Sequence, residues 1–454
     1  SFWEKQINSA YGSAELAWND YAFLTVTARN DWFSTLSLKD KKAPNNDLYT
    51  SASLSLVLSD ALDLGSAVSF LKFRAGYSQV AGGAGSPYAL SLSYGIYGQG
   101  HLGASLGNIS GNRIPNSEIT PFEKNETEFG MDLRLFDNKL SIDATYYDNE
   151  TVGDIVGVSA SATSGYNSAL ANLGEISNKG IELLVKGTIM QTADFAWNAT
   201  LNYTNNESKV VATNDTGGNI SMDEPRSRNL RVTHIVGEKY GALYGSSFVR
   251  DTNGALVHEM VNGIPIPKVG PRKILGFGVA PTQLGIGSNF RYKDFDAGFL
   301  IEGKMGGQIY SGSNAYLKRN GHHKSTVPAG GREGGWVPTG VMEGGGAVTT
   351  SIPAAQQEDY YRRSYLIAEQ DVIDSDYMRL RQLSIGYTIP SDKLQGTFID
   401  KATVSLIGRN LFFLSNNVDN VDPESAYNAS NSAGLEYFAL PVPRTIGLNV
   451  NLKF

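Results

Sequence analysis

The sequence contains no cysteine among its 454 residues. A chain of this length without cysteine can have neither a disulfide framework nor a thiolate metal site. Charged residues are also few, at 18% with a net charge of −7, and the chain has no cluster of Lys and Arg that would neutralise phosphates. We therefore expect no nucleic-acid partner. A hydrophobic content of 41% argues against intrinsic disorder.

Long apolar runs are missing as well. The longest resemble Leu411-Phe412-Phe413-Leu414, far below the roughly 18 residues that predict a membrane-spanning helix. The common catalytic motifs are also absent, including the G-x-S-x-G elbow, the H-E-x-x-H metal helix and the phosphate-binding loop. The sequence therefore predicts a protein that is not an enzyme and that has no cofactor.

Two short patterns contain residues that could ligate a metal ion. His322 and His323 are adjacent in a polar segment, and Asp422 and Glu424 flank a proline near Asp419. Carboxylates in such a turn are hard oxygen ligands of the kind that calcium prefers. A solvated histidine pair and a turn set by the proline are the favoured interpretations, so no metal site is predicted.

The chain does contain a two-residue apolar period almost throughout. In the last segment Ile446, Leu448, Val450, Leu452 and Phe454 alternate with small or polar residues. The same alternation recurs in segments near 128–135, 140–146, 195–204, 295–301 and 383–389. Strict alternation predicts strands with one apolar and one polar face. The segments are about ten residues long, as a tilted membrane-spanning strand requires.

The connections between these segments alternate between short and long. Short turns lie near 19–20, 60–67, 137–138, 191–193, 293–294 and 390–400, and long polar loops lie near 31–49, 80–122, 150–176, 206–279, 305–375 and 413–440. Outer-membrane β-barrels have short periplasmic turns and long extracellular loops. One hairpin for each short turn, plus the terminal strand, gives about thirteen strands. The predicted fold is an all-β transmembrane antiparallel barrel.

A soluble β-sandwich also alternates apolar and polar residues. The strand length, the aromatic residues near strand ends and the aromatic terminal residue Phe454, a candidate barrel-assembly signal, favour the membrane barrel. Bacterial barrels have even strand numbers, so an odd count predicts that residues 1–454 are the C-terminal part of one barrel. The terminal strand is then expected to pair with a strand that precedes Ser1.

The largest loop, 305–375, is rich in glycine and carries most candidate contact residues. A loop this long without evident structure is usually functional or disordered. Aromatic and basic side chains are the candidates for binding cargo or a partner, namely Trp32, Trp336, Tyr360, Tyr361, Arg362 and Arg363. Packing of one loop against another is the alternative for these side chains.

Several segments together resemble the SusC/RagA-type TonB-dependent transporters of Bacteroidetes outer membranes. They are residues 29–32 (RNDW), 73–82 (FRAGYSQVAG), 126–147, 172–183 (NLGEISNKGIEL), 377–387 (YMRLRQLSIGY), 408–412 (GRNLF) and 443–445 (PRT). The resemblance implies a barrel of about 22 strands. It also implies that an N-terminal plug, the TonB-contacting segment and the first strands lie outside this chain.

The resemblance further implies import of large nutrients, either oligosaccharides or peptides, beneath a SusD-like surface lipoprotein. Oligosaccharides are slightly favoured because they are the commoner cargo of the family. Two alternatives remain open at this stage. One is a passive channel or a structural barrel that scaffolds a surface complex, and the other is a soluble secreted β-protein.

Overall fold

The computed structural model describes most of the chain. The described residues are 3–38, 43–88, 90–91, 94–98, 100–109, 113–114, 116–159, 163, 166, 168–213, 218–223, 229–425, 427 and 433–454. Parts of the predicted loops 31–49, 80–122, 150–176, 206–279 and 413–440 therefore lie outside the described residues. No helix among the described residues is long and apolar enough to cross a membrane.

One thirteen-stranded sheet dominates the fold. Its strands follow the order β1-β2-β3-β4-β8-β9-β12-β13-β20-β21-β25-β26-β28. Each long strand is hydrogen-bonded to the next long strand of the chain, so the sheet is a succession of hairpins. The predicted all-β class and the number of long strands are confirmed.

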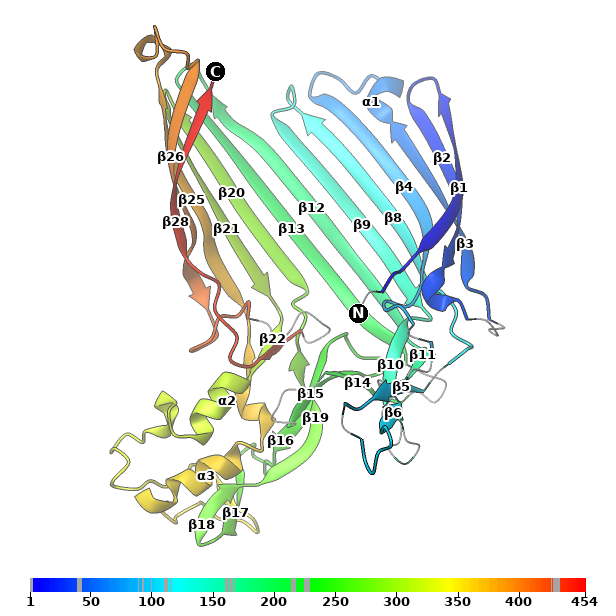
Figure 1. Ribbon diagram of the computed structural model, residues 1–454. Coiled ribbons are helices and arrows are strands. Elements are labelled where there is room, and N and C mark those ends of the chain that lie inside the picture. The colour runs from blue at the N-terminus through cyan, green and yellow to red at the C-terminus, as the bar shows by residue number, and fades with distance from the viewer. Residues whose placement is uncertain are drawn as a thin grey trace. The chain divides into compact units, whose positions relative to one another are not determined.

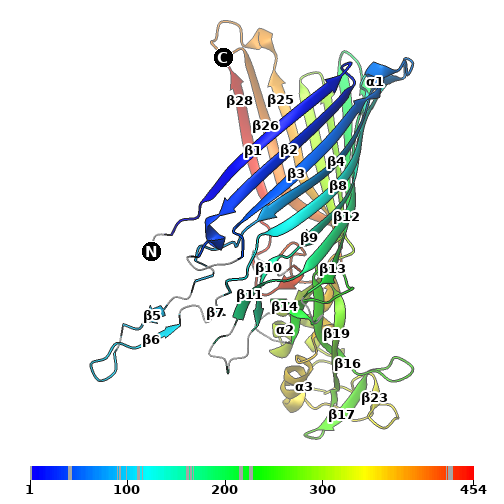
Figure 2. The ribbon, with the colours of Figure 1, turned by 90° about the vertical axis from the view of Figure 1, so that its right-hand side faces the viewer.

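The first of two compact units comprises residues 1–186, 206–220 and 236–238. Figure 2 shows its strands β1 to β4 side by side. The long strands are β1 (Ile7–Trp18), β2 (Ala22–Phe33), β3 (Asn46–Val57), β4 (Val68–Gly82), β8 (Phe122–Leu135), β9 (Leu140–Val152) and β12 (Glu175–Gln191). Shorter elements are α1 (Leu58–Ala61), β5 (Tyr94–Ile96), β6 (Gly107–Ile109), β7 (Arg113–Ile114), β10 (Ile155–Ser159) and β11 (Ser168–Asn172).

In this unit the strand register places similar residues opposite one another on neighbouring strands. One apolar row runs through Leu16, Leu24, Leu54, Ala75, Phe129 and Tyr146. On the other face Arg74 forms ion pairs with Glu128 at 3.2 Å and with Asp143 at 2.9 Å. Neighbouring positions in a strand point to opposite faces, so the period of two in the sequence becomes one apolar and one polar face.

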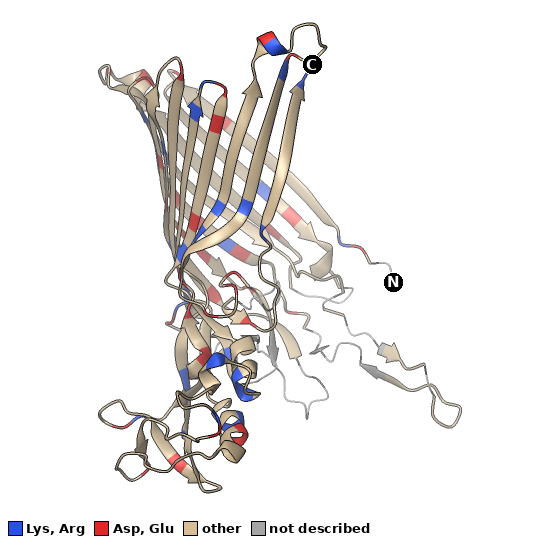
Figure 3. Ribbon diagram, turned by 90° about the vertical axis from the view of Figure 1, so that its left-hand side faces the viewer, with Lys and Arg blue, Asp and Glu red and all other residues tan. Residues whose placement is uncertain are grey.

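The second unit comprises residues 187–205, 221–235 and 239–454. Its long strands are β13 (Phe195–Ala212), β20 (Thr282–Tyr292), β21 (Phe295–Met305), β25 (Tyr377–Ile389), β26 (Lys401–Asn416) and β28 (Thr445–Lys453). An apolar row crosses them through Trp197, Phe290, Ala297, Ile385, Leu406 and Leu448. Ile385, Leu406 and Leu448 are each more than half exposed. Strand β28 carries no charge before Lys453 (Figure 3).

Tight turns join the hairpins at positions that need a left-handed backbone. Asn19 and Asp20 have φ values of 48° and 59°, and Asp137 and Asn138 have values of 56° and 63°. Asn and Asp tolerate positive φ better than other residues with a side chain, and consecutive positive φ values match the twist of two paired strands. These turns are among the short turns that the sequence predicts.

The long connections of the second unit fold into structure of their own, at one end of strands β20, β21 and β25 (Figure 1). Their strands are β14 (Ile220–Asp223), β15 (Leu230–His234), β16 (Ala242–Phe248), β17 (Val257–Val261), β18 (Ile264–Pro267), β19 (Val269–Phe277), β22 (Gln308–Ser311), β23 (Val341–Met342), β24 (Val372–Asp374) and β27 (Leu435–Glu436). Their helices are α2 (Gly312–Arg319) and α3 (Gln357–Ser364). We call residues 229–235, 239–279, 306–376 and 433–444 the loop module.

The loop module corrects one sequence expectation. Segment 305–375 shows no structural pattern in the sequence, yet it holds two helices and three short strands. The helices have eight residues each. A helix of two turns is too short to show a 3.6-residue apolar period, and it is stabilised mainly by tertiary packing.

Candidate functional site

An apolar cluster joins three distant segments of the loop module. Its fully buried members are Leu230, Val232, Leu243, Tyr310, Ala315, Ala368 and Leu435. They belong to the segments after β13, after β21 and after β26. Burial of about 25 cal/mol per Å² of apolar surface is the main favourable term that holds such segments together. The loop module therefore has a core of its own.

A buried carboxylate fixes the start of α2. Glu436 is 1% exposed and accepts hydrogen bonds from the hydroxyls of Ser311 at 2.9 Å and Ser313 at 2.6 Å. The Ser311 side chain also accepts a bond from the Asn314 amide, as an N-cap residue does. The Phe438 amide donates to the Ser313 hydroxyl at 2.7 Å, so the same contacts position Phe438 beside α2.

Helix α3 is held by an aromatic cluster. Tyr360 is buried, and its ring lies edge-on to Trp336 with centroids 5.0 Å apart. Tyr361 lies edge-on to Tyr360 at 5.2 Å and is stacked on Trp336 at 6.5 Å. Burial raises the pKa of the Tyr360 hydroxyl and that of the Tyr361 hydroxyl, so both phenols stay protonated. Edge-to-face and offset pairs of this kind stabilise a cluster beyond the area it buries.

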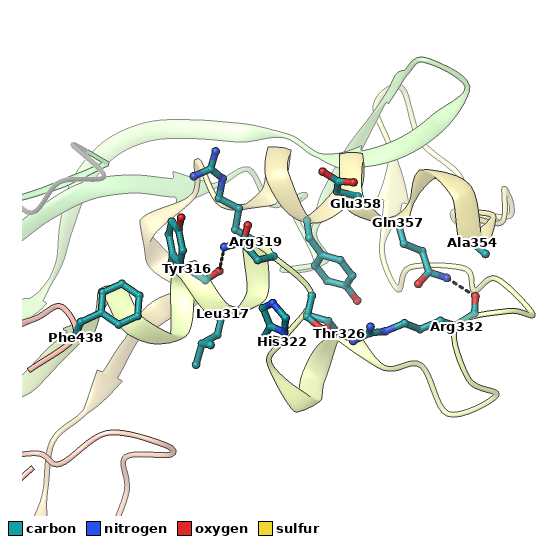
Figure 4. A pocket seen from close by; sticks show the side chains of 13 residues that line it. Tyr316, Leu317, Arg319, His322, Thr326, Arg332, Ala354, Gln357, Glu358 and Phe438 are labelled. Atoms are coloured by element: carbon teal, nitrogen blue, oxygen red, sulfur yellow. Dashed lines mark hydrogen bonds between the residues drawn. The ribbon is translucent and has the colours of Figure 1, made fainter. Parts of the chain in front are cut away.

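A cleft of about 730 Å³ opens between α2 and α3. Its lining includes Tyr316, Leu317, Arg319, Asn320, Gly321, His322, Thr326, Arg332, Ala354, Gln357, Glu358, Tyr361 and Phe438. Figure 4 shows Phe438 and Tyr316 at one end of the cleft and Ala354 and Gln357 at the other. The volume lies within the range of about 300–1,000 Å³ that is typical of ligand sites.

The lining combines flat aromatic rings with polar groups. Tyr316 and Phe438 are 37% and 56% exposed, and their rings lie 5.6 Å apart and nearly perpendicular. Asn320 and His322 belong to the turn that follows α2, and the Gln357 amide donates to the Arg332 carbonyl at 2.8 Å. Exposed rings beside hydrogen-bonding side chains can bind a ligand that has both apolar faces and polar edges.

A second polar site lies where β25 leaves the loop module. Arg379 forms ion pairs with Asp422 at 2.6 Å and with Glu424 at 2.5 Å, and Arg381 bonds Glu424 at 2.6 Å and Glu302 at 2.5 Å. The neighbouring hollow of about 280 Å³ is lined by Asn202, Thr204, Gln283, Leu284, Gly285, Glu302, Gly303, Lys304, Tyr377, Arg381 and Glu424. The polar faces of four strands therefore line this hollow.

The two arginines bind the carboxylates that the sequence offers as possible calcium ligands. Burial acts to raise the pKa of Glu424, but the hydrogen bonds from Arg381 and Tyr377 outweigh it and hold the pKa below its ordinary value. Asp422 and Glu424 therefore pair with guanidinium groups. His323 is similarly occupied, since its ring nitrogen accepts from the Ser325 amide. His322 lines the cleft.

The structure places the predicted contact residues in different settings. Tyr361 lines the cleft, with Trp336 and Tyr360 packed behind it. Arg362 pairs with Glu358 at 3.6 Å and Arg363 with Asp359 at 3.0 Å, each within α3.

The two remaining predicted residues lie in the long strands or beyond them. Trp32 lies in β2 opposite Asn8 and Asn46, and it is 39% exposed. Phe454 is exposed, and its ring stacks on Phe398 at 5.5 Å. The roles of these residues in binding and assembly remain predictions.

Most residues of the cleft were not predicted from the sequence. Arg319, Arg332 and Phe438 lie in segments far apart in the chain, and no local pattern connects them. The sequence of α3 contained one signal. An acidic and a basic residue are spaced four apart twice, at Glu358 and Arg362 and at Asp359 and Arg363. Such pairs favour a helix and would have marked one wall of the cleft.

The sheet, its apolar rows and the folded loops define a class of protein, the outer-membrane β-barrel. Residues 2–411 match the family model described as "TonB dependent receptor-like, beta-barrel". The chain belongs to this TonB-dependent receptor β-barrel family. It is therefore an outer-membrane protein, and its family consists of transporters rather than enzymes.

Curated relatives support the same assignment. The TonB-dependent receptor P3 of Formosa agariphila is 26% identical over 485 residues, which cover 99% of this chain and 46% of that protein. The TonB-dependent receptor SusC of Bacteroides thetaiotaomicron is 25% identical over 207 residues, which cover 43% of this chain and 20% of SusC. The resemblance to SusC/RagA-type transporters is confirmed. The chain spans about half the length of the first of these relatives.

Solved structures show the same fold. The RagAB peptide importer in its closed-closed state superposes with a TM-score of 0.78 at 16% identity, and the match covers 99% of this chain and 48% of that one. A second structure of the RagAB peptide transporter gives a TM-score of 0.75 at 15% identity, with 99% and 48% covered. At these identities the likeness concerns the fold alone.

Proposed function

We propose that this chain is the barrel part of a TonB-dependent importer. It would bring oligosaccharides or peptides across the outer membrane and would work with a SusD-like surface lipoprotein. Its family and its SusC relative support energy-coupled import. The observation that carries the capture step is the cleft between α2 and α3, which is built on a loop module with its own core.

The division of labour follows from the two kinds of structure. Binding residues are often placed on loops that a rigid scaffold supports, and the antiparallel sheet is such a scaffold. The hollow beside β25 is lined by polar side chains and could accept hydrated cargo that leaves the loops. Arg379 and Arg381 join this hollow to the segment around Glu424.

The test measures uptake of labelled oligosaccharides and peptides by cells that produce the full-length protein. Import should stop when TonB is deleted, and the surface lipoprotein should co-purify with the barrel. Uptake that continues at the same rate without TonB would identify a passive channel. A barrel that transports neither class but still co-purifies with a surface complex would identify a scaffold.

A further inference from the structure

Arg319 is a guanidinium without an acidic partner. It lies in the last turn of α2, and among the described residues it has no hydrogen bond and no ion pair. The central guanidinium carbon, Cζ, lies 5.2 Å from the ring centroid of Tyr365 and 5.7 Å from that of Tyr316. Stacking on rings holds the planar group in place while leaving its N–H donors free.

Arg332 enters the same cleft with most of its donors free. Its Nη2 donates to the Gly321 carbonyl and, at 3.0 Å, to the Thr326 hydroxyl. Within the described part of the chain its Nη1 and Nε have no partner. Figure 4 shows Arg332 extending from one wall of the cleft towards Thr326. Both acceptors are neutral, so the positive charge of Arg332 is not compensated by a carboxylate.

Three other arginines of the loop module are paired with carboxylates. Arg250 pairs with Glu369 at 2.6 Å, and Arg362 and Arg363 pair with carboxylates of their own helix. Glu358, the carboxylate in the cleft lining, is the partner of Arg362. The cleft therefore concentrates uncompensated positive charge in a chain whose net charge is −7. A partly enclosed site of this kind attracts anions.

We infer that the cleft between α2 and α3 binds an acidic oligosaccharide, whose carboxylate or sulfate groups are held by Arg319 and Arg332 while its sugar rings lie against Tyr316 and Phe438. A guanidinium group can donate to two oxygens of a carboxylate or of a sulfate at once. The exposed Asn320 side chain also lines the cleft; its amide nitrogen donates to the Tyr316 carbonyl, so its side-chain oxygen can accept from a sugar hydroxyl. The inference deepens the proposed function, because it rests on the loop module as the place of cargo capture.

The lining favours a sugar chain over an extended peptide. An extended peptide is commonly recognised by adding a strand to an exposed sheet edge. The cleft lining comes from helices α2 and α3, from the turn after α2, and from the segments that hold Arg332 and Phe438. None of the described lining residues belongs to a strand, so the cleft presents side chains rather than a strand edge. Side chains with flat faces and hydrogen-bonding ends match a ligand that has ring faces and hydroxyl edges.

The experiment compares acidic and neutral probes on the purified full-length protein in detergent. The probes are a tetrasaccharide of galacturonic acid, its neutral galactose counterpart, a sulfated galactose tetrasaccharide and a glutamate-rich peptide. Titration calorimetry would be run at low and at moderate salt, because screening weakens exposed ionic contacts. The variants are Arg319→Gln, Arg332→Gln and Arg332→Lys. The control Lys324→Gln removes a cation that pairs with Asp419 outside the cleft.

We expect at least one acidic tetrasaccharide to bind about tenfold or more tightly than its neutral counterpart, with an advantage that shrinks as salt rises. Arg319→Gln and Arg332→Gln should each reduce that affinity about tenfold, Arg332→Lys should reduce it less, and Lys324→Gln should leave it unchanged. Near-ultraviolet circular dichroism of each variant checks that the loop module is still folded.

Three results would overturn the inference. They are equal binding of acidic and neutral sugars, affinity that is unchanged in both folded glutamine variants, and tighter binding of the acidic peptide than of every sugar. TonB-dependent uptake of another cargo in the presence of any of these results would leave the proposed function standing. Loss of TonB dependence with intact acidic-sugar binding would refute the proposed function instead.

Discussion

The long strands and the loop module obtain their order from different physical sources. In the sheet each strand is specified locally, because apolar and polar residues alternate and like residues meet across every pair, as in the row from Trp197 to Leu448. In the loop module order comes from contacts between segments that are far apart, such as Glu436 with Ser311 and Ser313. A substitution should therefore act locally in the sheet but disconnect whole segments in the loop module.

The largest effect is expected at the junction of the two regions. Arg379 is 3% exposed, and its replacement by Met would leave Asp422 and Glu424 without that partner. Removing one partner of a buried ion pair costs about 3–5 kcal/mol. Hydrogen exchange of residues 417–425 should rise sharply in Arg379→Met while the long strands stay protected. The exposed Arg409 on β26 gives the control Arg409→Met, and equal exchange in the two variants would contradict the prediction.

The second-largest effect is expected from a substitution on the apolar face of the sheet. Ile385 lies in the exposed apolar row, and Gln382 lies on the opposite face of the same strand. An Arg on the lipid-facing side of a membrane strand near mid-bilayer costs about 2–4 kcal/mol, whereas a polar interior tolerates charge. Ile385→Arg should lower the denaturant midpoint of the refolded protein in vesicles, and Gln382→Arg should change it little. The reverse order would mean that the faces are assigned wrongly.

The same contrast explains what could be predicted from the sequence. The period of two is a local property, so the alternation at residues 446–454 was sufficient to predict strand β28 and its two faces. The cleft depends on non-local contacts: Trp336 meets Tyr360, and Phe438 meets Tyr316 across more than a hundred residues. A single sequence does not show which distant side chains pack together. Only Tyr361 of the predicted contact residues lines the cleft, because its position depends on that packing.

A pH-dependent effect is expected in the loop module at His234. Burial lowers the pKa of His234 from 6.5 to about 4. Above pH 6.5 the imidazole is neutral in both the folded and the unfolded state, so stability there does not change with pH. Between pH 6.5 and 4 the unfolded state takes up a proton that the folded state does not, so stability falls with pH, by up to about 3 kcal/mol. Protection factors of the amides in β15 and β16, which correct for the intrinsic exchange rate at each pH, should therefore fall on acidification.

Replacing His234 by Phe should remove that part of the pH dependence, because the titrating group is gone while a ring still packs beside Tyr240. The exposed His101 supplies the control His101→Gln, which should keep the pH dependence of the native chain. An identical fall of these protection factors on acidification in His234→Phe and in the native chain would show that other groups cause it.

The smallest effect should come from the outer surface of α3, and it separates the cleft wall from the rest of the helix. Arg363 is partly exposed and pairs with Asp359 of its own helix, whereas Tyr361 lines the cleft. An exposed i,i+4 ion pair contributes about 0.3–0.5 kcal/mol, so Arg363→Ala should barely change stability. It should also change the affinity for an oligosaccharide cargo by less than about twofold, because 1.4 kcal/mol corresponds to tenfold. Tyr361→Ala removes a ring from the lining and should weaken binding several times more. Calorimetric titration of the two variants measures the difference, and a larger loss in Arg363→Ala would place the contact surface on the exposed side of α3 instead of in the cleft.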